Sequence, residues 1–340
     1  MTAGDTMQAW GARRRTMLGL GAALGLMPGA WAQSLPSGVM PVLVLNSLDG
    51  NISVIDPQSW TEVQRLPTGK EPHHLYMTPD EQSVIVANAL SDSLTFIDPR
   101  TARIQRTLGD ILDPYHLRFS PDMKWLVTAG NRLNHVDIYR WDGRNPTLAK
   151  RLPTSRIPSH IWIDTRSTSA YVTMQGSNEL YTIDLLAQRV RHVAETGSTP
   201  ADVFVTPDDR TLLVGLTGAA GVEVFEIRQG VPVRTGLLPT GRGAHAFRAL
   251  GDRRHVLVSN RVENSIHLID YQNLQVVARL PGPSGPDCME VMRDGKTLLV
   301  ASRWADRLSV IDIPSRQLLR QVRVGNSPHG VWTLDHAGRA

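Results

Sequence analysis

The sequence predicts an all-β fold, a seven-bladed β-propeller of four-stranded antiparallel blades whose ring is closed by pairing of N- and C-terminal strands. Three observations lead to this prediction. Two turn motifs recur in step along most of the 340 residues. The segments between them are short, rich in valine, isoleucine and leucine, and without helical periodicity, which is typical of strands. The two ends of the repeat region each supply part of one repeat.

The first motif is a short apolar strand that ends in an acidic turn, and it has seven copies. Their spacings are 42, 41, 45, 42, 44 and 42 residues. Five copies read Ile-Asp and two are degenerate: Ile55-Asp56, Ile97-Asp98, Ile138-Tyr139, Ile183-Asp184, Phe225-Glu226, Ile269-Asp270 and Ile311-Asp312. A constant period of this length indicates that one supersecondary unit is repeated along the chain.

The second motif is a Pro-Asp turn that keeps step with the first. It has three clear copies and four weaker ones: Pro79-Asp80, Pro121-Asp122, Pro207-Asp208, Asp164, Asp252, Asp294 and Asp335. In the repeat over 72–109 we expect strands at 74–78, 83–87, 93–97 and 103–107. Four strands at this period make a propeller blade, and radial closure leaves only short sheet edges.

The ends of the repeat region predict how the ring closes. Residues 41–66 supply three strands with no first strand before them, and residues 328–334 supply a first strand with no successors. Together they make the seventh blade. We therefore expect a propeller over 41–335, with a short linker over 33–40 and a C-terminal tail over 336–340.

The first 32 residues predict a cleavable export signal. Arg14 and Arg15 precede an apolar stretch over 18–27, and Ala30-Trp31-Ala32 offers small residues for a signal peptidase. The stretch is too short for a permanent membrane anchor. The paired arginines resemble a twin-arginine signal, and an ordinary secretory signal is the alternative. Either way, we expect a periplasmic, exported protein.

Charge and cysteine content exclude several classes. The formal charge is +4 and falls to +2 without residues 1–32, and no run of basic residues forms a stripe, so we expect no nucleic-acid partner. The single cysteine, Cys288, cannot form an internal disulfide or the CxxCH attachment of covalent haem.

The repeats also resemble a known family. The segments over 83–98 (SVIVANALSDSLTFID) and 297–312 (TLLVASRWADRLSVID) are similar to YVTN-type propeller repeats, and the resemblance covers residues 41–335. The family occurs in surface-layer and other extracytoplasmic proteins and, in related form, in the haem-binding propeller of nitrite reductases. The resemblance implies the architecture. It leaves the chemistry open, because one fold hosts many functions.

Seven equivalent positions form the candidate site. We align the repeats on the proline before each first strand, with Gly243 in its place in one repeat, and read two residues on. The positions hold His74, His116, His160, Asp202, His245, Cys288 and Gly330. His73 and His329 stand one residue earlier. Because first strands line the tunnel, these side chains form a ring, either as a metal site or as imidazoles that cap the strand starts. Cys288 is either a ligand or an inert core residue.

Strand alternation predicts a second inward layer. Its members are Tyr76, Arg118, Trp162, Phe204, Phe247, Glu290 and Trp332. The aromatic residues can simply plug the tunnel. Arg118 and Glu290 need partners or a ligand, unless they satisfy each other. We therefore take Arg118, Tyr76 and Glu290 as candidate cofactor-binding residues.

The residue types point to a transition metal, because imidazole and thiolate suit copper, zinc, iron and nickel. A histidine ring in a seven-bladed propeller looks like the copper site of nitrous oxide reductase, which places copper first. An axial histidine for a non-covalent haem is the other use. We expect a metal- or haem-binding accessory, carrier or redox protein, and a monomer.

Two other functions remain open at this point. One is a scaffold without a ligand that holds a protein partner on a propeller face. The other is a metal-dependent, lactonase-like hydrolase, which needs more carboxylates than Asp202 and Glu290.

Overall fold

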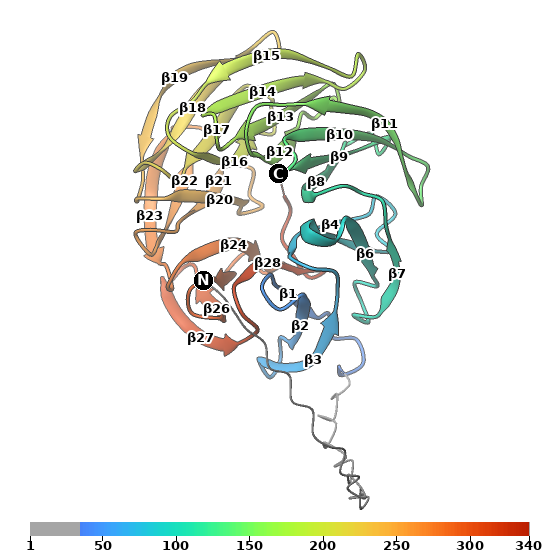
Figure 1. The fold of residues 1–340 in the computed structure, drawn as a ribbon. Helices are drawn as coiled ribbons and strands as arrows, with labels where there is room; N and C mark the ends of the chain where they lie inside the picture. Colours follow the sequence, from blue (N-terminus) through green and yellow to red (C-terminus); the bar gives the residue numbers. More distant parts are fainter. Residues whose placement is uncertain (1–34, 340) are drawn as a thin grey trace, which may run out of the picture. The chain divides into compact units, whose positions relative to one another are not determined.

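The computed structural model describes residues 35–339, which form seven four-stranded antiparallel sheets arranged around a central axis (Figure 1). This confirms the predicted seven-bladed propeller. The export signal predicted over 1–32 lies outside the described residues. None of the helices within 35–339 has the length and hydropathy needed to cross a membrane.

Each blade is a meander that runs outward from the axis. The innermost strands are β4 (Pro72–Met77), β8 (Pro114–Phe119), β12 (Pro158–Ile163), β16 (Pro200–Val205), β20 (Ala244–Ala249), β24 (Pro286–Val291) and β28 (Pro328–Thr333). The second strands are β5 (Val84–Asn88), β9 (Trp125–Gly130), β13 (Ser169–Met174), β17 (Thr211–Leu216), β21 (His255–Asn260), β25 (Thr297–Ser302) and β1 (Val42–Asn46).

The outer half of each blade completes the sheet. The third strands are β6 (Ser93–Ile97), β10 (His135–Trp141), β14 (Glu179–Asp184), β18 (Gly221–Arg228), β22 (Ser265–Asp270), β26 (Arg307–Asp312) and β2 (Asn51–Asp56). The outermost strands are β7 (Ile104–Leu108), β11 (Pro146–Pro153), β15 (Arg189–Glu195), β19 (Val231–Pro239), β23 (Gln275–Pro281), β27 (Gln317–Arg323) and β3 (Thr61–Pro67). A single 3₁₀ turn, η1 (Ala89–Ser91), follows β5.

Burial follows from this radial order. All five residues of β5 are buried, because neighbouring blades cover both faces of the second strand. The outermost strand β15 instead alternates between exposed and half-buried residues. The four strands expected in 72–109 are all present. The third matches the prediction, while the first starts at Pro72 and the fourth ends at Leu108.

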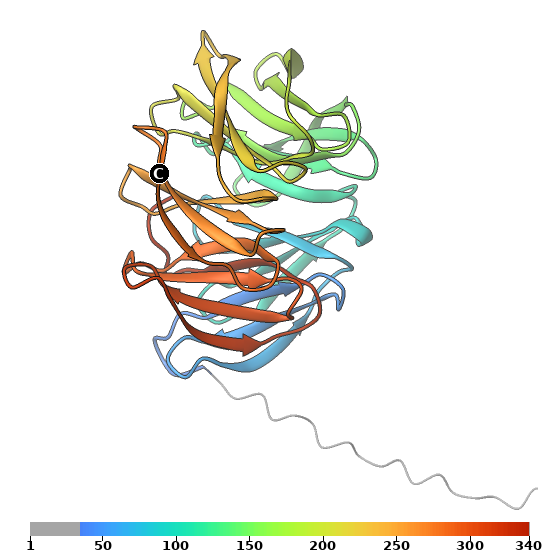
Figure 2. The same cartoon turned by 90° about the vertical axis from the view of Figure 1, so that its left-hand side faces the viewer.

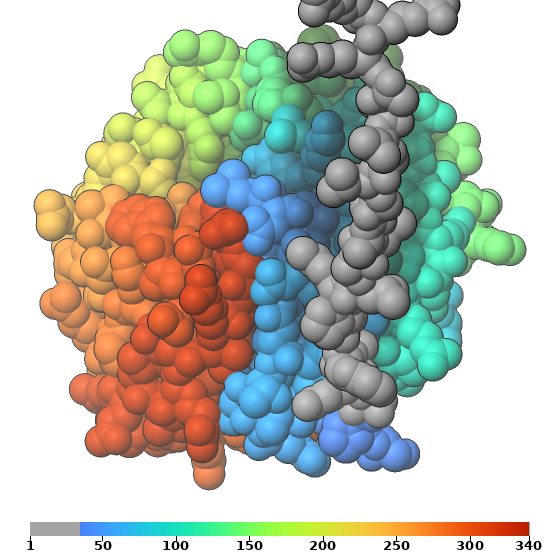
Figure 3. Space-filling model, turned by 60° about the horizontal axis from the view of Figure 1, so that its bottom comes forward, coloured from blue at the N-terminus to red at the C-terminus, as the bar shows by residue number. Residues whose placement is uncertain are grey.

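The predicted ring closure is also confirmed. Strand β28 pairs antiparallel with β1, with Val42 opposite Thr333 and Leu43 opposite Trp332. In Figure 3 the red C-terminal blade lies against the blue N-terminal strands. The side chain of Asn46 reinforces the join by accepting a hydrogen bond from the Gly325 amide over 3.0 Å.

The residues after β28 fold back onto the ring. The Ala337 amide donates to the Val291 carbonyl over 2.8 Å, and Met292 and His336 form an isolated bridge. The segment runs toward the centre of the ring in Figure 1 and lies on one face of it in Figure 2. It therefore covers part of one end of the tunnel.

Every innermost strand carries a bulge near its start. In β4, Pro72 pairs with Asn88 and His74 with Ala87, so a step of two residues in β4 faces a step of one in β5. In β12, Pro158 and Ile161 are three residues apart, but their partners in β13 are only two apart. A bulge adds one residue to a strand and changes the direction of a side chain. The strict alternation expected from the sequence is therefore broken where the histidines lie.

Candidate metal centre in the propeller tunnel

The bulges produce two rings of residues at the start of the tunnel. The first ring follows the first residue of each innermost strand: His73, Tyr115, Ser159, Ala201, His245, Asp287 and His329. The second ring comes one residue later: His74, His116, His160, Asp202, Ala246, Cys288 and Gly330. Together the two rings hold six histidines.

One repeat was aligned one residue out of register. Ala244 pairs with Asn260 as Pro72 pairs with Asn88, so Ala244 and not Gly243 is equivalent to the prolines. His245 therefore belongs to the first ring. In the deeper layer the equivalent residue is Arg248 and not Phe247. Pro-Thr-Gly occurs at 67–69 and again at 239–241, five residues before Pro72 and Ala244, and would have fixed this register from the sequence.

The six imidazoles pack against one another with almost no access to solvent. Their exposed fractions lie between 0% for His329 and 9% for His74 and His116. The ring of His74 is central, with its centroid 4.5 Å from that of His116, 4.8 Å from His160 and 4.7 Å from His329. Glycine at 330 leaves room for this packing, because a Cβ there would lie 2.8 Å from Leu45 Cδ1 and 3.2 Å from the His73 carbonyl oxygen.

Burial keeps these histidines neutral. It lowers the pKa of His245 to about 3 and also lowers the pKa of the other five below the ordinary value of 6.5. Neighbouring imidazoles oppose any added charge, as for His74 beside His116. A neutral imidazole carries one nitrogen lone pair, which is the form that binds metals.

Each of the six histidines keeps one buried ring nitrogen without a hydrogen-bond partner among the described residues. These atoms are His73 Nδ1, His74 Nε2, His116 Nδ1, His160 Nε2, His245 Nδ1 and His329 Nε2. An unpaired buried polar atom costs about 1–3 kcal/mol. Strand capping accounts for His329, whose Nδ1 donates to the His73 carbonyl over 2.8 Å. It leaves an unpaired ring nitrogen on each of His74, His116 and His160, and an imidazole nitrogen without a hydrogen-bond partner can coordinate an ion.

Within residues 35–339, three groups of side chains can hold an ion, each with ligand atoms within 4.8 Å of one another. They are His74, His116 and His160; His73, His74 and His329; and His245, Asp287 and His329. The groups overlap at His74 and His329. They differ in the charges that surround them.

The group His74, His116 and His160 is the stronger metal site. It comes from three neighbouring blades, through β4, β8 and β12. The His160 Nδ1 lies 2.9 Å from the Ser159 hydroxyl, which orients the ring and leaves Nε2 free. Such a second contact is typical of histidine ligands. Three histidines are also the protein ligands of some catalytic zinc sites, in which water or substrate takes the fourth position.

The group around Asp287 already contains cations. Arg261 Nη2 lies 2.6 Å and Arg303 Nη1 3.3 Å from Asp287 Oδ2. Burial alone would raise the pKa of Asp287, but Arg261, His329 and His245 outweigh it and hold that pKa well below its ordinary value. A metal ion here would compete with Arg261 for the same carboxylate.

The remaining second-ring candidates lie in no metal group of the described chain. Asp202 accepts hydrogen bonds of 2.8 Å from the backbone amides of Val203 and Phe247, so both oxygens of its carboxylate already have partners within the protein. The Cys288 sulfur lies 3.6 Å from His329 Nδ1. Burial and the nearby Asp287 raise the pKa of this thiol well above its ordinary value, which disfavours the thiolate.

In the deeper layer, Arg118 and Glu290 do not satisfy each other, contrary to one of the expectations above. Glu290 pairs with Arg248 and Arg339, each at 2.5 Å. The Arg118 guanidinium instead lies over the Trp162 ring, 3.6 Å from its centroid. A cavity of about 130 Å³ connects this layer with the second ring.

Sequence reasoning missed the residues that surround Asp287. Asp287 precedes Cys288, at the position that His73 and His329 hold in their strands, and the sequence analysis assigned it no role. Arg261 and Arg303 follow the second strands β21 and β25, and each is one residue past the end of its strand. Because the two arginines share this position, an alignment of the repeats could have identified them as a pair.

The protein is therefore a closed β-propeller with a candidate metal centre, formed by buried, neutral histidines at the start of its tunnel. Residues 8–339 match the model of the YNCE-like β-propellers, and the chain belongs to this family. No curated protein matches the chain.

Several solved structures resemble the chain. The hydrazine synthase of Kuenenia stuttgartiensis is 20% identical over 76% of this chain and 88% of that one, with a TM-score of 0.65. Dihydro-heme d1 dehydrogenase NirN, in complex with DHE, is 16% identical over 91% and 78%, with a TM-score of 0.66. The periplasmic gluconolactonase PpgL of Pseudomonas aeruginosa is 18% identical over 89% and 100%, with a TM-score of 0.75. At these identities the likeness shows a shared fold.

Proposed function

We propose that this protein binds one transition-metal ion through His74, His116 and His160 and serves outside the cytoplasm as a metal carrier, accessory protein or redox component. The observation that carries the proposal is the convergence of three neutral, buried imidazoles whose ligand atoms lie within 4.8 Å of one another. Each also has a ring nitrogen without a partner among the described residues.

The donor set favours a late first-row metal. Imidazole nitrogens suit copper, zinc, nickel and iron, and the Irving–Williams order gives copper the highest affinity among divalent ions. Calcium and magnesium prefer oxygen ligands. The adjoining cavity of about 130 Å³ is smaller than the roughly 300–1,000 Å³ of sites for larger organic ligands. An ion therefore fits beside these histidines better than a haem does.

An exported location rests on the sequence of residues 1–32. A periplasmic place also agrees with the name of the gluconolactonase PpgL, which shares the fold. Ligation by histidine suits such a location, because it does not depend on a reduced thiol.

The test is metal content and metal affinity. Protein isolated from its native compartment is analysed for copper, zinc, nickel, iron and haem, and metal-free protein is titrated with Cu(II) and Zn(II). We expect one ion per chain and its loss in the double variant His116→Ala, His160→Ala. His192→Ala, which removes a histidine from the outermost strand β15, is the matched control. A protein without metal, whose titrations are the same in the double variant and the control, would overturn the proposal and favour a ligand-free scaffold.

A further inference from the structure

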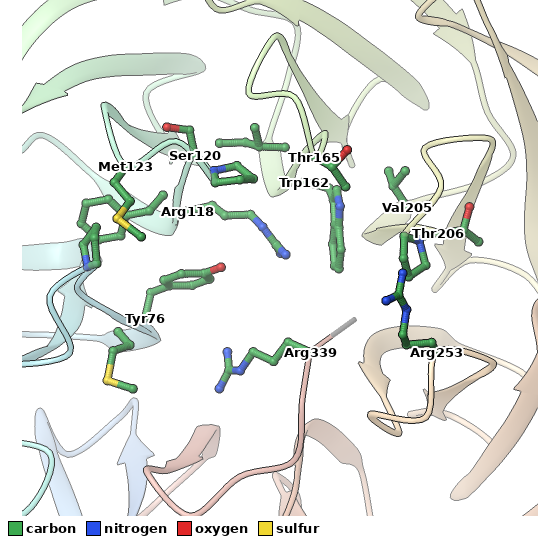
Figure 4. Close-up of a pocket in the computed structure, with 16 residues that line it drawn as sticks. Tyr76, Arg118, Ser120, Met123, Trp162, Thr165, Val205, Thr206, Arg253 and Arg339 are labelled. Carbon is green, nitrogen blue, oxygen red and sulfur yellow. The ribbon is translucent and has the colours of Figure 1, made fainter.

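The other end of the tunnel holds a separate pocket. Its volume is about 530 Å³, and it lies where the innermost strands β4, β8, β12 and β16 end. Figure 4 shows the side chains of Arg118 and Arg339 extending into the space between Tyr76 and Trp162. Three arginines line the pocket and no carboxylate does, while most other lining residues are apolar.

Arg118 is a cation without a polar partner. Within residues 35–339 its guanidinium forms no ion pair and no hydrogen bond that meets ordinary geometry. It lies over Trp162 at 3.6 Å and near Tyr76 at 5.6 Å, measured to the ring centroids. Contact with aromatic faces offsets part of the cost of burying a cation, but it leaves five N–H donors free. The nearby Asp202 is already bonded to two backbone amides.

The C-terminal segment brings a second guanidinium to the same place. Arg248 donates to the Ala337 carbonyl over 2.9 Å and so fixes the segment. The Arg339 guanidinium then lies 5.9 Å from the Tyr76 ring, on which Arg118 also lies. Glu290 is the one acidic group that pairs with Arg339 among the described residues, and it is shared with Arg248. Positive charge therefore exceeds negative charge here.

We propose that this pocket binds an organic anion with a flat apolar body, whose carboxylate lies between Arg118 and Arg339. Guanidinium groups bind carboxylates through paired, charge-assisted hydrogen bonds. Trp162 and the apolar side chains of Phe119 and Val205 provide surface for the body of the ligand. The inference goes beyond metal binding and does not depend on it.

The anion would lie next to the metal centre. The cavity of about 130 Å³ shares Tyr76, Arg118, Trp162 and Arg339 with the pocket and extends to His74, His116 and His160. The two sites are therefore neighbours, so we measure binding of the anion in metal-free protein and binding of the ion without the anion.

The test uses 1-naphthoate and its uncharged analogue 1-naphthalenemethanol, titrated calorimetrically into metal-free protein in chelator-free buffer. We expect naphthoate to bind at least tenfold more tightly than the alcohol. Arg118→Met keeps an unbranched side chain of similar length and removes the charge. We expect it to weaken naphthoate roughly tenfold or more and to leave the alcohol unchanged. Arg118→Lys should restore part of the affinity.

Arg228→Gln is the matched control, because this exposed arginine pairs with Glu226 on the outside of a blade. Arg339→Gln gives a second measurement at a partly exposed residue and decides the matter if Arg118→Met does not fold. Equal affinities for naphthoate and the alcohol, or naphthoate binding that neither arginine variant weakens, would overturn the proposal. Because the protein is free of metal throughout, that result would leave the metal site untouched.

Discussion

His329 donates a hydrogen bond from Nδ1 to the backbone carbonyl of His73 over 2.8 Å, across 256 residues of sequence. A neutral imidazole has one N–H, so this bond places the lone pair of His329 on Nε2. That atom has no hydrogen-bond partner among the described residues and lies 3.4 Å from Asp287 Oδ1. His329 stands on β28, the strand that closes the ring. Closing the propeller therefore also completes the histidine cluster.

The closing strand should matter strongly for stability. Trp332 on β28 is fully buried and packs with Leu43 and Leu45 of β1. We expect Trp332→Ala to lower the free energy of unfolding by about 3–5 kcal/mol, because it leaves a large cavity in the joining blade. Urea denaturation measures the effect. Trp304→Ala, at a residue that is 56% exposed, should change stability by about 0.5 kcal/mol or less. Equal effects would mean that the join contributes little.

An ion pair between a buried carboxylate and an exposed arginine, in the outer part of a blade, predicts a pH dependence. Arg151 on β11 lies opposite Asp137 on β10 and donates two hydrogen bonds to its carboxylate, over 2.8 Å and 2.6 Å. Burial would raise the pKa of Asp137, but His135 and Arg151 outweigh burial and lower that pKa below 3.8. A lowered carboxyl pKa stabilises the fold above pH 3.8, and this contribution is lost as the pH falls through the folded-state pKa.

The variant Asp137→Asn should therefore be less stable by about 1–2 kcal/mol at pH 7, because the hydrogen bonds to a buried carboxylate lose their charge while the exposed Arg151 side chain stays solvated. At a pH below the folded-state pKa of Asp137, where the wild-type carboxyl is protonated as well, the two proteins should differ much less. Urea denaturation at both pH values is the measurement. A difference that stays constant with pH would show that the ion pair does not contribute through its charge.

The sequence predicts the architecture almost completely, because each blade must bury the same kind of sheet between the same turns. Ser93–Ile97 was expected as a strand and is one. The closing of the ring by 328–334 followed from counting strands at the two ends. Such features depend on local pattern and on the number of repeats, and both can be read directly from the residues.

The site was predictable only in part. The tunnel histidines His74, His116 and His160 follow from the position of the first strand in each repeat. Asp287 does not, since the bulge turns a second side chain inward that alternation assigns to the blade interior. The pairing of Glu290 with Arg339 was also hidden, because it requires the C-terminal segment to fold back over 49 residues of sequence.

That pairing leads to a third prediction. Glu290 is buried between Arg248 and Arg339, and Gln at this position keeps the volume but removes the charge. We expect Glu290→Gln to cost about 3–5 kcal/mol and to loosen the C-terminal segment. Hydrogen exchange at the Ala337 amide, which donates to the Val291 carbonyl, should become faster. Glu226→Gln breaks a fully exposed pair with Arg228 and should leave exchange at Ala337 unchanged. Unchanged exchange at Ala337 would show that the segment is held by its backbone contacts alone.

The site of metal binding can be assigned by substitution. An ion held by His74, His116 and His160 and an ion held by His245, Asp287 and His329 predict opposite effects of the same two substitutions. An ion that binds only the folded protein raises its stability by about 2.7 kcal/mol at a concentration 100 times the dissociation constant. We expect Cu(II) or Zn(II) to raise the melting temperature of the metal-free protein, as seen in thermal unfolding. His116→Gln should abolish this rise, because it removes one of the three ligands of the group His74, His116 and His160.

His245→Gln is the matched variant, since His245 is 1% exposed and belongs to the group around Asp287. Both substitutions replace a buried imidazole and should lower the stability of the metal-free protein to a similar degree. The metal-dependent rise should persist in His245→Gln, because Arg261 already balances the Asp287 carboxylate. If the rise instead disappears in His245→Gln and persists in His116→Gln, the ion binds at Asp287 and displaces the guanidinium of Arg261.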